Sequence, residues 1–303
     1  MKILITGASG LLGARLAEMA LARGHEVYSG YNSHQARSGK PVHLEITDQL
    51  SVAKLVSSVK PEVIIHTAAL TDVDQCETER QLAYNVNAKG TENIARASRE
   101  SSCFLIYVST DAVFDGEKGG YSEGDSPHPL NWYGYTKLKG EEFTKSHANE
   151  WCIARTSVVY GWGREHRANF ATWVLQNLTP EKELKVVNDQ FASPTLNSNL
   201  AAMLLEVAET KITSLIHLAG LTRVSRYEFA QSLARTFSLD AKLVRALAIE
   251  ELKAWKAPRA HDSSLSVALA NTILRRERPV SLTKALEQFR QEPESRVFPE
   301  TRV

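Results

Sequence analysis

Short apolar runs alternate with longer amphipathic segments in the first half of the chain. The short runs are rich in β-branched residues and bounded by turn residues, which predicts strands over residues 2–6, 25–31, 42–44, 63–66, 104–109 and 152–155. Between most of them, apolar residues recur at helical spacing, which predicts helices over residues 11–21, 50–59, 82–98 and 135–146. This alternation predicts an α/β fold with a doubly wound parallel sheet that binds ligands at the carboxyl ends of its strands.

Beyond residue 156 the alternation becomes less regular. The pattern predicts helices over residues 169–178, 197–208, 225–237 and 281–289, and one strand near residues 215–218. We therefore expect a larger domain over residues 1–156, completed by residues 195–220. A smaller C-terminal domain would consist of residues 157–194 and 221–303.

The composition of the 303 residues is that of an ordinary soluble globular protein, with 43% hydrophobic and 23% charged positions. The 36 basic and 35 acidic residues form no long run of one sign, so we expect no nucleic acid partner. No window approaches the roughly 20 apolar residues that span a bilayer, so we expect no membrane partner. Three cysteines without CxxC spacing suit reduced thiols, which favours a cytoplasmic protein.

A glycine-rich turn joins the first predicted strand to the first predicted helix. Glycine permits positive φ and a close approach of the backbone to a pyrophosphate, while the helix N-terminus supplies N–H donors. We therefore predict a Rossmann-type NAD(P) site in the larger domain. The candidate contacts in the GxxGxxG turn are Gly7, Ser9, Gly10, Leu11, Leu12 and Gly13.

The end of the second predicted strand indicates which dinucleotide is preferred. Residues 31–33 read YNS and carry no carboxylate that would repel a 2′-phosphate. With Asn32 and Arg37 as contacts, NADP(H) is favoured over NAD(H), although a solvated loop cation is an equally good interpretation of Arg37. Later candidates are Asp48, for the adenine, and Ala68 and Ala69, whose small side chains leave room for a flat cofactor.

Tyr133 and Lys137 are four residues apart and share one face of a helix that begins near Asn131. An ammonium group beside a phenol lowers the phenol pKa from about 10, so Tyr133 could donate a proton as a hydride reaches a carbonyl carbon. Thr110, directly after the strand over residues 104–109, could hold the substrate oxygen. Tyr-x3-Lys pairs occur by chance, so this pair gains its weight from the dinucleotide turn. Tyr135 is only two residues before Lys137, so these two side chains do not share a helix face.

Other chemically suggestive residues have simpler interpretations. Asp72 can cap a helix whose first turns contain further acidic residues, so we expect a helix N-terminus there and no metal site. We interpret Trp162, Trp173 and Trp255 as core residues. Only Trp162 follows a strand end closely enough to suggest a substrate cleft.

The motifs resemble those of the extended short-chain dehydrogenase/reductase family: the GxxGxxG turn, STD at residues 109–111 and YGYTK at residues 133–137. Within it, HTAA at 66–69, NVN at 85–87, PLN at 129–131, RTS at 155–157 and NDQF at 188–191 look like those of dTDP-4-dehydrorhamnose reductases. Such enzymes reduce the 4-keto group of a nucleotide-linked deoxysugar with NAD(P)H. The resemblance implies a catalytic triad of Thr110, Tyr133 and Lys137, a cofactor site that includes Asn87, and substrate contacts at Asp111, Val158 and Gln190.

The resemblance also leaves alternatives open. Ala112 and Val158 stand where the family usually has tyrosine and tryptophan beside the sugar, so the cavity is expected to be wider and its sugar is not fixed. An epimerase or dehydratase of the same fold would keep its cofactor bound and regenerate it. A third alternative is a non-catalytic regulatory subunit, because the chain also resembles the methionine adenosyltransferase β subunit. For the oligomeric state we consider a homodimer.

Overall fold

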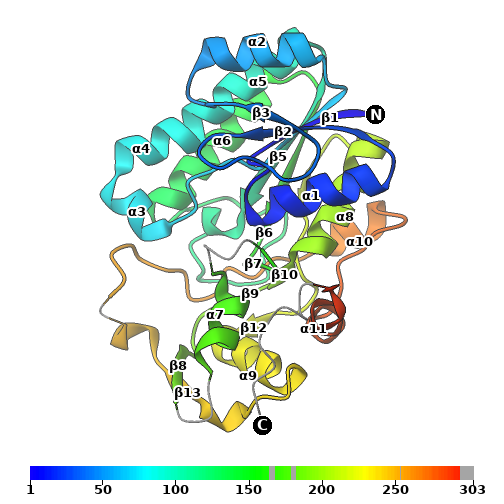
Figure 1. The fold of residues 1–303 in the computed structure, drawn as a ribbon. Coiled ribbons are helices and arrows are strands. Elements are labelled where there is room, and N and C mark those ends of the chain that lie inside the picture. Colours follow the sequence, from blue (N-terminus) through cyan, green and yellow to red (C-terminus); the bar gives the residue numbers. More distant parts are fainter. Residues whose placement is uncertain (164–167, 179–181, 253, 294–303) are drawn as a thin grey trace.

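The computed structural model describes residues 1–163, 168–178, 182–252 and 254–293 (Figure 1). The smaller domain expected from the sequence also includes residues 164–167, 179–181, 253 and 294–303, which lie outside the described residues. In Figure 1 a sheet covered by helices forms the upper half, and a smaller group of helices and short strands forms the lower half.

A parallel sheet of seven strands forms the centre of the upper half, in the order β11-β6-β5-β4-β1-β2-β3. Every residue of β4 and β5 is buried, which explains why these runs are continuously apolar instead of alternating. The doubly wound α/β fold predicted from the sequence is confirmed. The strands are β1 Lys2–Thr6, β2 Glu26–Tyr31, β3 Lys40–His43, β4 Val63–His66, β5 Phe104–Thr110, β6 Trp151–Thr156 and β11 Leu215–His217.

Helices cover both faces of this sheet. Ile3 and Ile5 point to the face covered by α1 (Leu11–Ala22), α8 (Asn197–Thr210) and α10 (Ala268–Ile273). Leu4 points to the opposite face, where α2 (Gln49–Val59) and α5 (Gly90–Glu100) pack and α6 (Trp132–His147) lies beside α5. The helix predicted over residues 82–98 is three pieces: α4 (Arg80–Tyr84), the π-helical turn η1 (Asn85–Lys89) and α5.

The lower half has an apolar core of its own, built around aromatic residues such as Tyr160, Phe229 and Phe289. Its helices α7 (Phe170–Asn177), α9 (Arg226–Thr236) and α11 (Leu282–Gln291) agree with the predicted ones to within a few residues. Its strands escaped prediction because most contain only two residues, too few for any period. They pair as β7 (Val159–Tyr160) with β10 (Thr195–Leu196), β9 (Phe191–Ala192) with β12 (Val224–Ser225), and β8 (Leu184–Val187) with β13 (Val244–Leu247).

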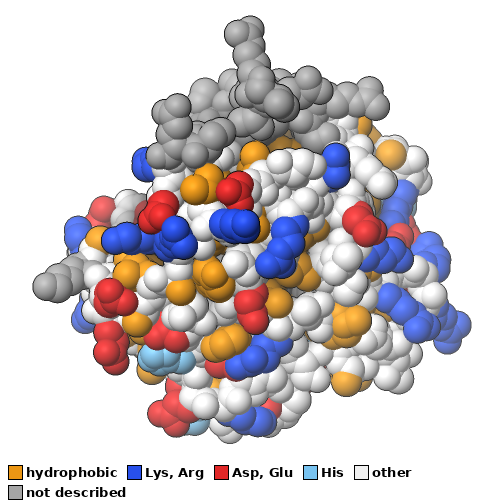
Figure 2. Space-filling view, turned by 90° about the horizontal axis from the view of Figure 1, so that it is seen from below, with side chains coloured by type: hydrophobic (Ala, Val, Ile, Leu, Met, Phe, Trp, Pro, Cys, Tyr) orange, Lys and Arg blue, Asp and Glu red, His pale blue; other side chains and the backbone are white. Residues whose placement is uncertain are grey.

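The remaining short elements are α3 (Val73–Thr78) and the 3₁₀ turns η2 (Asp111–Val113), η3 (Ala241–Leu243) and η4 (Ile249–Glu251). The face seen from below in Figure 2 carries basic and acidic side chains next to each other, with apolar ones between them. Within the described part of the chain, no helix is both long and apolar enough to cross a membrane.

A buried ion pair attaches α6 to the sheet. Arg155 of β6 donates through Nε and Nη2 to the two carboxylate oxygens of Glu141 in α6, at 2.8 and 2.7 Å. The Oγ of Ser109 in β5 donates to the same carboxylate at 2.6 Å. The Arg155 and Glu141 side chains are only 2% and 1% exposed, so each charge depends on the other for compensation.

Replacing one partner of this pair should therefore destabilise the whole fold. For Glu141→Gln we expect the free energy of unfolding to fall by about 3–5 kcal/mol, because Arg155 keeps a buried charge that lacks its counter-ion. Denaturant unfolding measures the change. Glu142→Gln is the matched control, since Glu142 pairs with Lys139 on the exposed side of the same helix and its loss should cost less than about 1 kcal/mol. Equal losses in the two variants would contradict the assigned role.

Candidate active site

A cavity of about 1750 Å³ opens at the carboxyl ends of the central strands. Its walls come from both halves of the molecule. On one side lie the turn after β1, the ends of β2, β4 and β5, and α6; on the other lie α7, β8 and the side chains of Leu252, Trp255, Arg259, Ala260 and Ser263. Most residues selected from the sequence line it: Gly7, Ser9, Gly10, Leu11, Leu12, Gly13, Asn32, Ala68, Ala69, Thr110, Asp111, Tyr133, Lys137, Val158 and Gln190.

The glycine turn is shaped for a ligand that lies against the backbone. Gly7 has a φ of +66°, and a Cβ at this position would lie 2.8 Å from the backbone of Ala68. A Cβ on Gly13 would collide with the Gly7 carbonyl oxygen. Gly10 caps α1 without any side-chain hydrogen bond, so the first N–H groups of the helix remain available to an anion. These features fit the pyrophosphate of a dinucleotide.

Three residues selected for the cofactor do not line the cavity. Arg37 is exposed, outside the cavity walls. The Asp48 carboxylate caps α2 by accepting from the N–H groups of Leu50 and Ser51 at 3.0 and 3.2 Å. Asn87 is buried in the π-helical turn η1.

Asn87 supports the cavity wall without lining the cavity itself. Its Oδ1 accepts from the N–H of Leu70 at 2.8 Å, and its Nδ2 donates to the Leu70 carbonyl at 3.0 Å and to Thr136 Oγ1 at 3.1 Å. The side chain therefore joins the loop after β4 to α6. Because Ala68 and Ala69 in that loop line the cavity, Asn87 helps to set their position.

Glu45 is a wall residue that the sequence interpretation missed. It lies two residues after β3, and its carboxylate accepts from Asn32 Nδ2 at 2.7 Å and from the N–H of Thr47 at 3.0 Å. Its position as the first carboxylate after the third strand was a usable signal.

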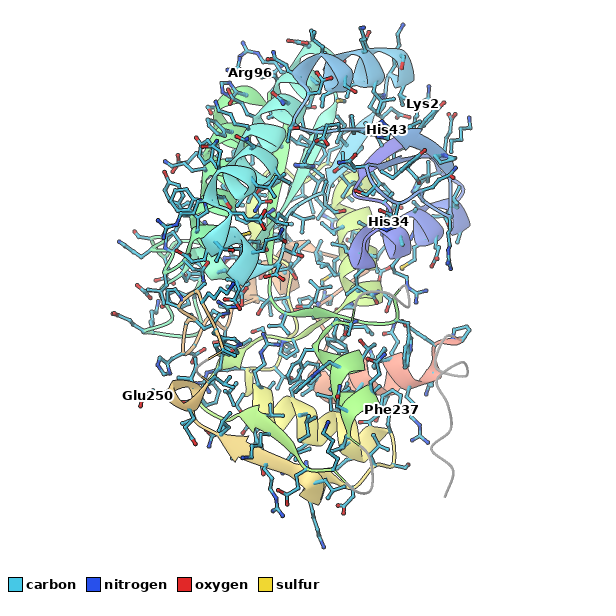
Figure 3. The ribbon with its side chains drawn as sticks, turned by 60° about the vertical axis from the view of Figure 1, so that its left-hand side comes forward. Lys2, His34, His43, Arg96, Phe237 and Glu250 are labelled. Atoms are coloured by element: carbon cyan, nitrogen blue, oxygen red, sulfur yellow. The ribbon has the colours of Figure 1, made fainter. Side chains whose placement is uncertain are left out.

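His34, another wall residue, lies on the loop after β2, in the half that contains the sheet. Phe237 and Glu250 lie far away in the other half (Figure 3).

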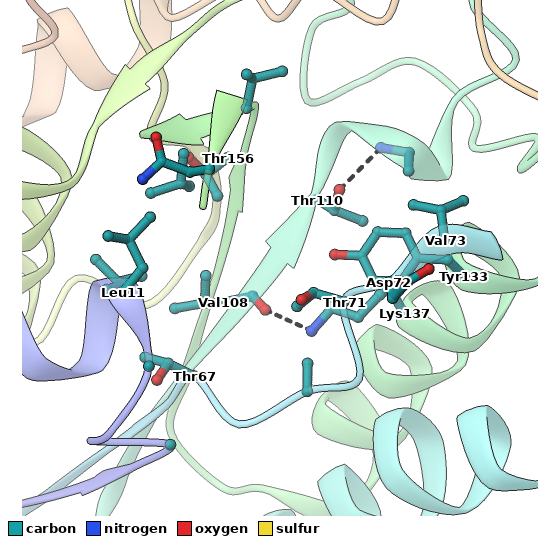
Figure 4. Close-up of a pocket in the computed structure, with 18 of the residues that line it drawn as sticks. Leu11, Thr67, Thr71, Asp72, Val73, Val108, Thr110, Tyr133, Lys137 and Thr156 are labelled. Carbon is teal, nitrogen blue, oxygen red and sulfur yellow. Dashed lines mark hydrogen bonds between the residues drawn. The ribbon is translucent and has the colours of Figure 1, made fainter. Parts of the chain in front are cut away.

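Tyr133 and Lys137 both reach the cavity from α6. Asn131 starts the helix by accepting from the N–H of Gly134 at 2.9 Å. Lys137 donates through Nζ to the Val108 carbonyl at 2.8 Å (Figure 4). In the same view the phenol oxygen of Tyr133 points toward Thr110. The structure thus brings together the hydroxyl, phenol and amine groups that the sequence selected.

The protonation of these groups differs from the sequence-based expectation. Burial raises the pKa of Tyr133 above its usual value, and hydrogen bonding with Thr110 only partly opposes this. Burial lowers the pKa of Lys137 to about 7. The net shift of the phenol pKa is therefore opposite to the lowering expected from the sequence, because burial dominates and Lys137 Nζ is directed at the Val108 carbonyl. At neutral pH, Tyr133 keeps its proton.

The lower half contributes the predicted wall residues Val158 and Gln190, and also Arg226, which no sequence motif marks. Gln190 accepts at its carbonyl oxygen from the N–H of Arg226 at 3.0 Å, and at Oε1 from Arg226 Nε at 3.3 Å. Arg226 thereby presents a guanidinium to the cavity, with Phe170 4.9 Å below it. Val158 has a φ of +41°, a strained conformation for a β-branched residue at a cavity wall.

The tryptophan assignments need correction. Trp162 is 7% exposed in the lower core, where it stacks on Phe289 and donates through Nε1 to the Phe289 carbonyl. Trp173 packs against the lower core, as predicted, and also lines the cavity, whereas Trp255, assigned to the core from the sequence, lines the cavity. The assignment of Asp72 is confirmed, because it caps α3 by accepting from the N–H of Gln75 at 2.9 Å.

The lowered pKa of Lys137 predicts how stability depends on pH. Between about 7 and 10.5 the unfolded chain binds more protons at this lysine than the folded chain, so the free energy of unfolding rises with pH in that window. Lys137→Met removes this contribution. Relative to the variant, the free energy of unfolding of the wild type should rise by up to about 1.4 kcal/mol per pH unit between pH 7 and 10.

Denaturant unfolding at several pH values measures this difference. Lys139→Met is the control, because the ammonium of Lys139 pairs with Glu142 at the surface of the same helix. A wild-type-minus-Lys137→Met difference that stays constant with pH would contradict the assignment.

The chain is similar to known proteins over almost its whole length. The family model described as "RmlD substrate binding domain" matches residues 1–292. A dTDP-4-dehydrorhamnose reductase from Aggregatibacter actinomycetemcomitans is 36% identical over 236 residues, 76% of this chain and 76% of that protein. The methionine adenosyltransferase 2 subunit beta of Xenopus laevis is 33% identical over 264 residues, 85% of this chain and 78% of that one. The crystal structure of dTDP-4-dehydrorhamnose reductase from Bacillus anthracis in complex with NADP has a TM-score of 0.86 and 33% identity, and the match covers 95% of this chain and 99% of that one.

Proposed function

The chain belongs to the RmlD substrate binding domain family, and from this premise we propose that it is an NAD(P)H-dependent oxidoreductase that reduces the keto group of a nucleotide-activated sugar. One observation carries the proposal: Thr110, Tyr133 and Lys137 line the same cavity as a glycine turn shaped for a pyrophosphate. A reducible carbonyl between them would meet a proton donor and a bound dinucleotide together.

Each residue of the site has a separate role in the proposed reaction. A reduced nicotinamide, when bound, would supply the hydride for the carbonyl carbon. The Thr110 hydroxyl holds the carbonyl oxygen, and Tyr133, kept neutral by burial, donates its proton to that oxygen. Lys137 has a pKa near 7 and adds positive charge beside the reaction when it is protonated. The residues that we propose hold the cofactor are Gly7, Ser9, Gly10, Leu11, Leu12, Gly13, Asn32, Ala68 and Ala69, with Asn87 acting through the loop after β4.

We assign the cofactor to residues 1–156 with 195–220, and the sugar nucleotide to residues 157–194 and 221–303. The substrate contacts in this proposal are Asp111, Val158 and Gln190. The three cysteines are free and buried, which supports a cytoplasmic location. A homodimer is the oligomeric state that we propose, and analytical ultracentrifugation would test it.

Two alternatives remain separable by experiment. An epimerase or dehydratase would regenerate its cofactor, so net consumption of NADPH distinguishes the proposed reductase from both. The similarity to a methionine adenosyltransferase subunit favours a regulatory role as the second candidate. No turnover with any sugar nucleotide, together with a stoichiometric enzyme partner from the native cell, would support that role.

Removing the proton donor should abolish most of the turnover. For Tyr133→Phe we expect kcat for NADPH oxidation with dTDP-4-dehydrorhamnose to fall by about 10² to 10⁴, while cofactor affinity changes little, because only the hydroxyl is lost. Tyr135→Phe is the matched control, since Tyr135 is on the same helix, stacks on Trp132 and does not line the cavity. Near-normal turnover of Tyr133→Phe would contradict the mechanism.

The preference for NADP(H) rests on the end of β2, where no carboxylate follows and Asn32, Ser33 and His34 line the cavity. We expect NADPH to bind tighter than NADH. Ser33→Asp should weaken NADPH by roughly tenfold to a hundredfold and NADH much less, because the new carboxylate would face the 2′-phosphate.

Fluorescence titration of both cofactors measures these affinities. Arg37→Ala is the companion variant. A loss of affinity for NADPH alone would assign the 2′-phosphate contact to Arg37. Unchanged affinities would assign that contact to the wall residues. Equal wild-type affinities for the two cofactors would contradict the preference.

A further inference from the structure

The cavity wall in the lower half contains a positive charge that no described carboxylate compensates. Arg226, the first residue of α9, is partly buried and lines the cavity. Its Nε donates to Gln190 Oε1 at 3.3 Å. Within the described part of the chain, its Nη1 and Nη2 make no hydrogen bond and no carboxylate lies within ion-pair distance. Because a desolvated charge is costly without a counter-ion, this guanidinium favours an anion in the cavity.

Arg259 shows how a paired guanidinium is held on the same wall. It donates through Nη2 to Asp74 Oδ1 at 3.1 Å and through Nη1 to the Ala257 carbonyl at 2.8 Å. Its charge is thus compensated inside the protein, and a ligand would compete with these bonds. Arg226 uses one of its five guanidinium N–H donors on a described residue, so the edge formed by Nη1 and Nη2 remains available to a ligand.

The Asp111 carboxylate is near Arg226 but is already stabilised by hydroxyl groups. Its Oδ1 accepts from Thr110 Oγ1 at 3.1 Å, and its Oδ2 accepts from Ser157 Oγ and Ser263 Oγ, both at 2.7 Å. Burial lowers the pKa of Arg226 to about 10, although Asp111 opposes the shift, so the guanidinium stays charged at neutral pH. Because Asp111 directly follows Thr110, the available edge lies toward the reacting end of the cavity.

Contacts with two other elements fix the direction of the guanidinium before any ligand binds. Gln190, between β8 and β9, accepts from both the N–H and the Nε of Arg226, and the Phe170 ring of α7 lies 4.9 Å from the guanidinium carbon. Ser225 and Glu228 cap the start of α9 reciprocally, so the side chain and not the helix N-terminus is the donor group. A fixed fork of two N–H groups matches the two oxygens of a carboxylate or phosphate.

We propose that Arg226 binds an oxyanion of the substrate, beside the sugar, through its Nη1 and Nη2 groups. The assignment rests on the proposed function. It adds that the lower half holds an anion of its own, separate from the pyrophosphate of the cofactor at the glycine turn. Two substrate groups have this chemistry: a phosphate of the nucleotide and a carboxylate on the sugar.

Nucleotides without a keto group measure this contact without turnover. Isothermal titration calorimetry in the presence of NADP⁺ would use dTDP, dTDP-glucose and dTDP-glucuronate as probes. For Arg226→Gln we expect the affinity for each probe that carries the bound anion to fall by roughly tenfold to a hundredfold, because a charge-assisted contact is lost. Arg226→Lys should recover only part of this loss, since an ammonium group lacks the planar fork.

Arg235→Gln is the matched control. Arg235 lies on the same helix and also donates to a glutamine, Gln231, at 3.2 Å, but it does not line the cavity. Its replacement should leave all three affinities unchanged. The affinity for NADPH should be unchanged in both variants, because the cofactor binds to the other wall. A loss in Arg226→Gln that is confined to NADPH would place the contact on the cofactor and overturn the assignment.

Thermal unfolding separates ligand binding from support of the fold. Without nucleotide, the melting temperature of Arg226→Gln should not fall, because the variant removes a charge that no described residue compensates. A marked fall would show that the fold already compensates this charge, which would overturn the premise of the assignment.

The three probes distinguish the two anions. Equal losses for all three in Arg226→Gln would identify a phosphate of the nucleotide, and a loss for dTDP-glucuronate alone would identify a carboxylate on the sugar. Unchanged affinities for all three, or equal losses in Arg226→Gln and Arg235→Gln, would overturn the assignment. A wild-type protein that binds none of the three probes would instead overturn the proposed function.

Discussion

The bidentate ion pair between Arg155 and Glu141 fixes the geometry on which the cavity depends. Each of its members is close in sequence to a group that faces the cavity: Glu141 lies one turn after Lys137, and Arg155 directly precedes Thr156. Ser109, which donates to the same carboxylate, directly precedes Thr110. One buried charge cluster therefore sets the relative position of α6, β5 and β6. A shift of α6 along the sheet would separate the phenol from the Thr110 hydroxyl and unpair two buried charges at once.

Low polarity around this cluster also determines which groups carry protons. Burial favours the neutral forms of Tyr133 and Lys137, although Glu141 draws Lys137 toward its charged form. Asp111 experiences the same effect, tempered by hydroxyl donors. Three ionisable groups in one desolvated cavity are thus all shifted toward neutrality, which suits a reaction that moves a single proton. In solvent the same residues would be a phenol, an ammonium and a carboxylate.

The sequence was sufficient for the sheet and for the residues near its strand ends, because buried parallel strands produce continuous apolar runs and the glycine turn has a steric cause. It was insufficient where position depends on packing between the halves. Arg226 and Trp255 reach the cavity from segments without a motif, and Trp162 turned inward to stack on Phe289. Asp48 was selected for the cofactor although an aspartate at the start of a helix is a typical cap, which is the role that it has in the structure.

Among the polar links that join the two halves of the described structure are contacts of α3 and of the start of α6. Asp74 of α3 accepts from the N–H groups of Lys256 and Ala257, which holds the segment that bears Trp255. Asn131 caps α6 with one end of its amide and donates to the Pro258 carbonyl with the other, at 3.0 Å. The wall that would meet the sugar nucleotide and the helix that carries the phenol thus share an anchor. A displacement of that wall would therefore shift Asn131, the cap of α6, which lies two residues before Tyr133.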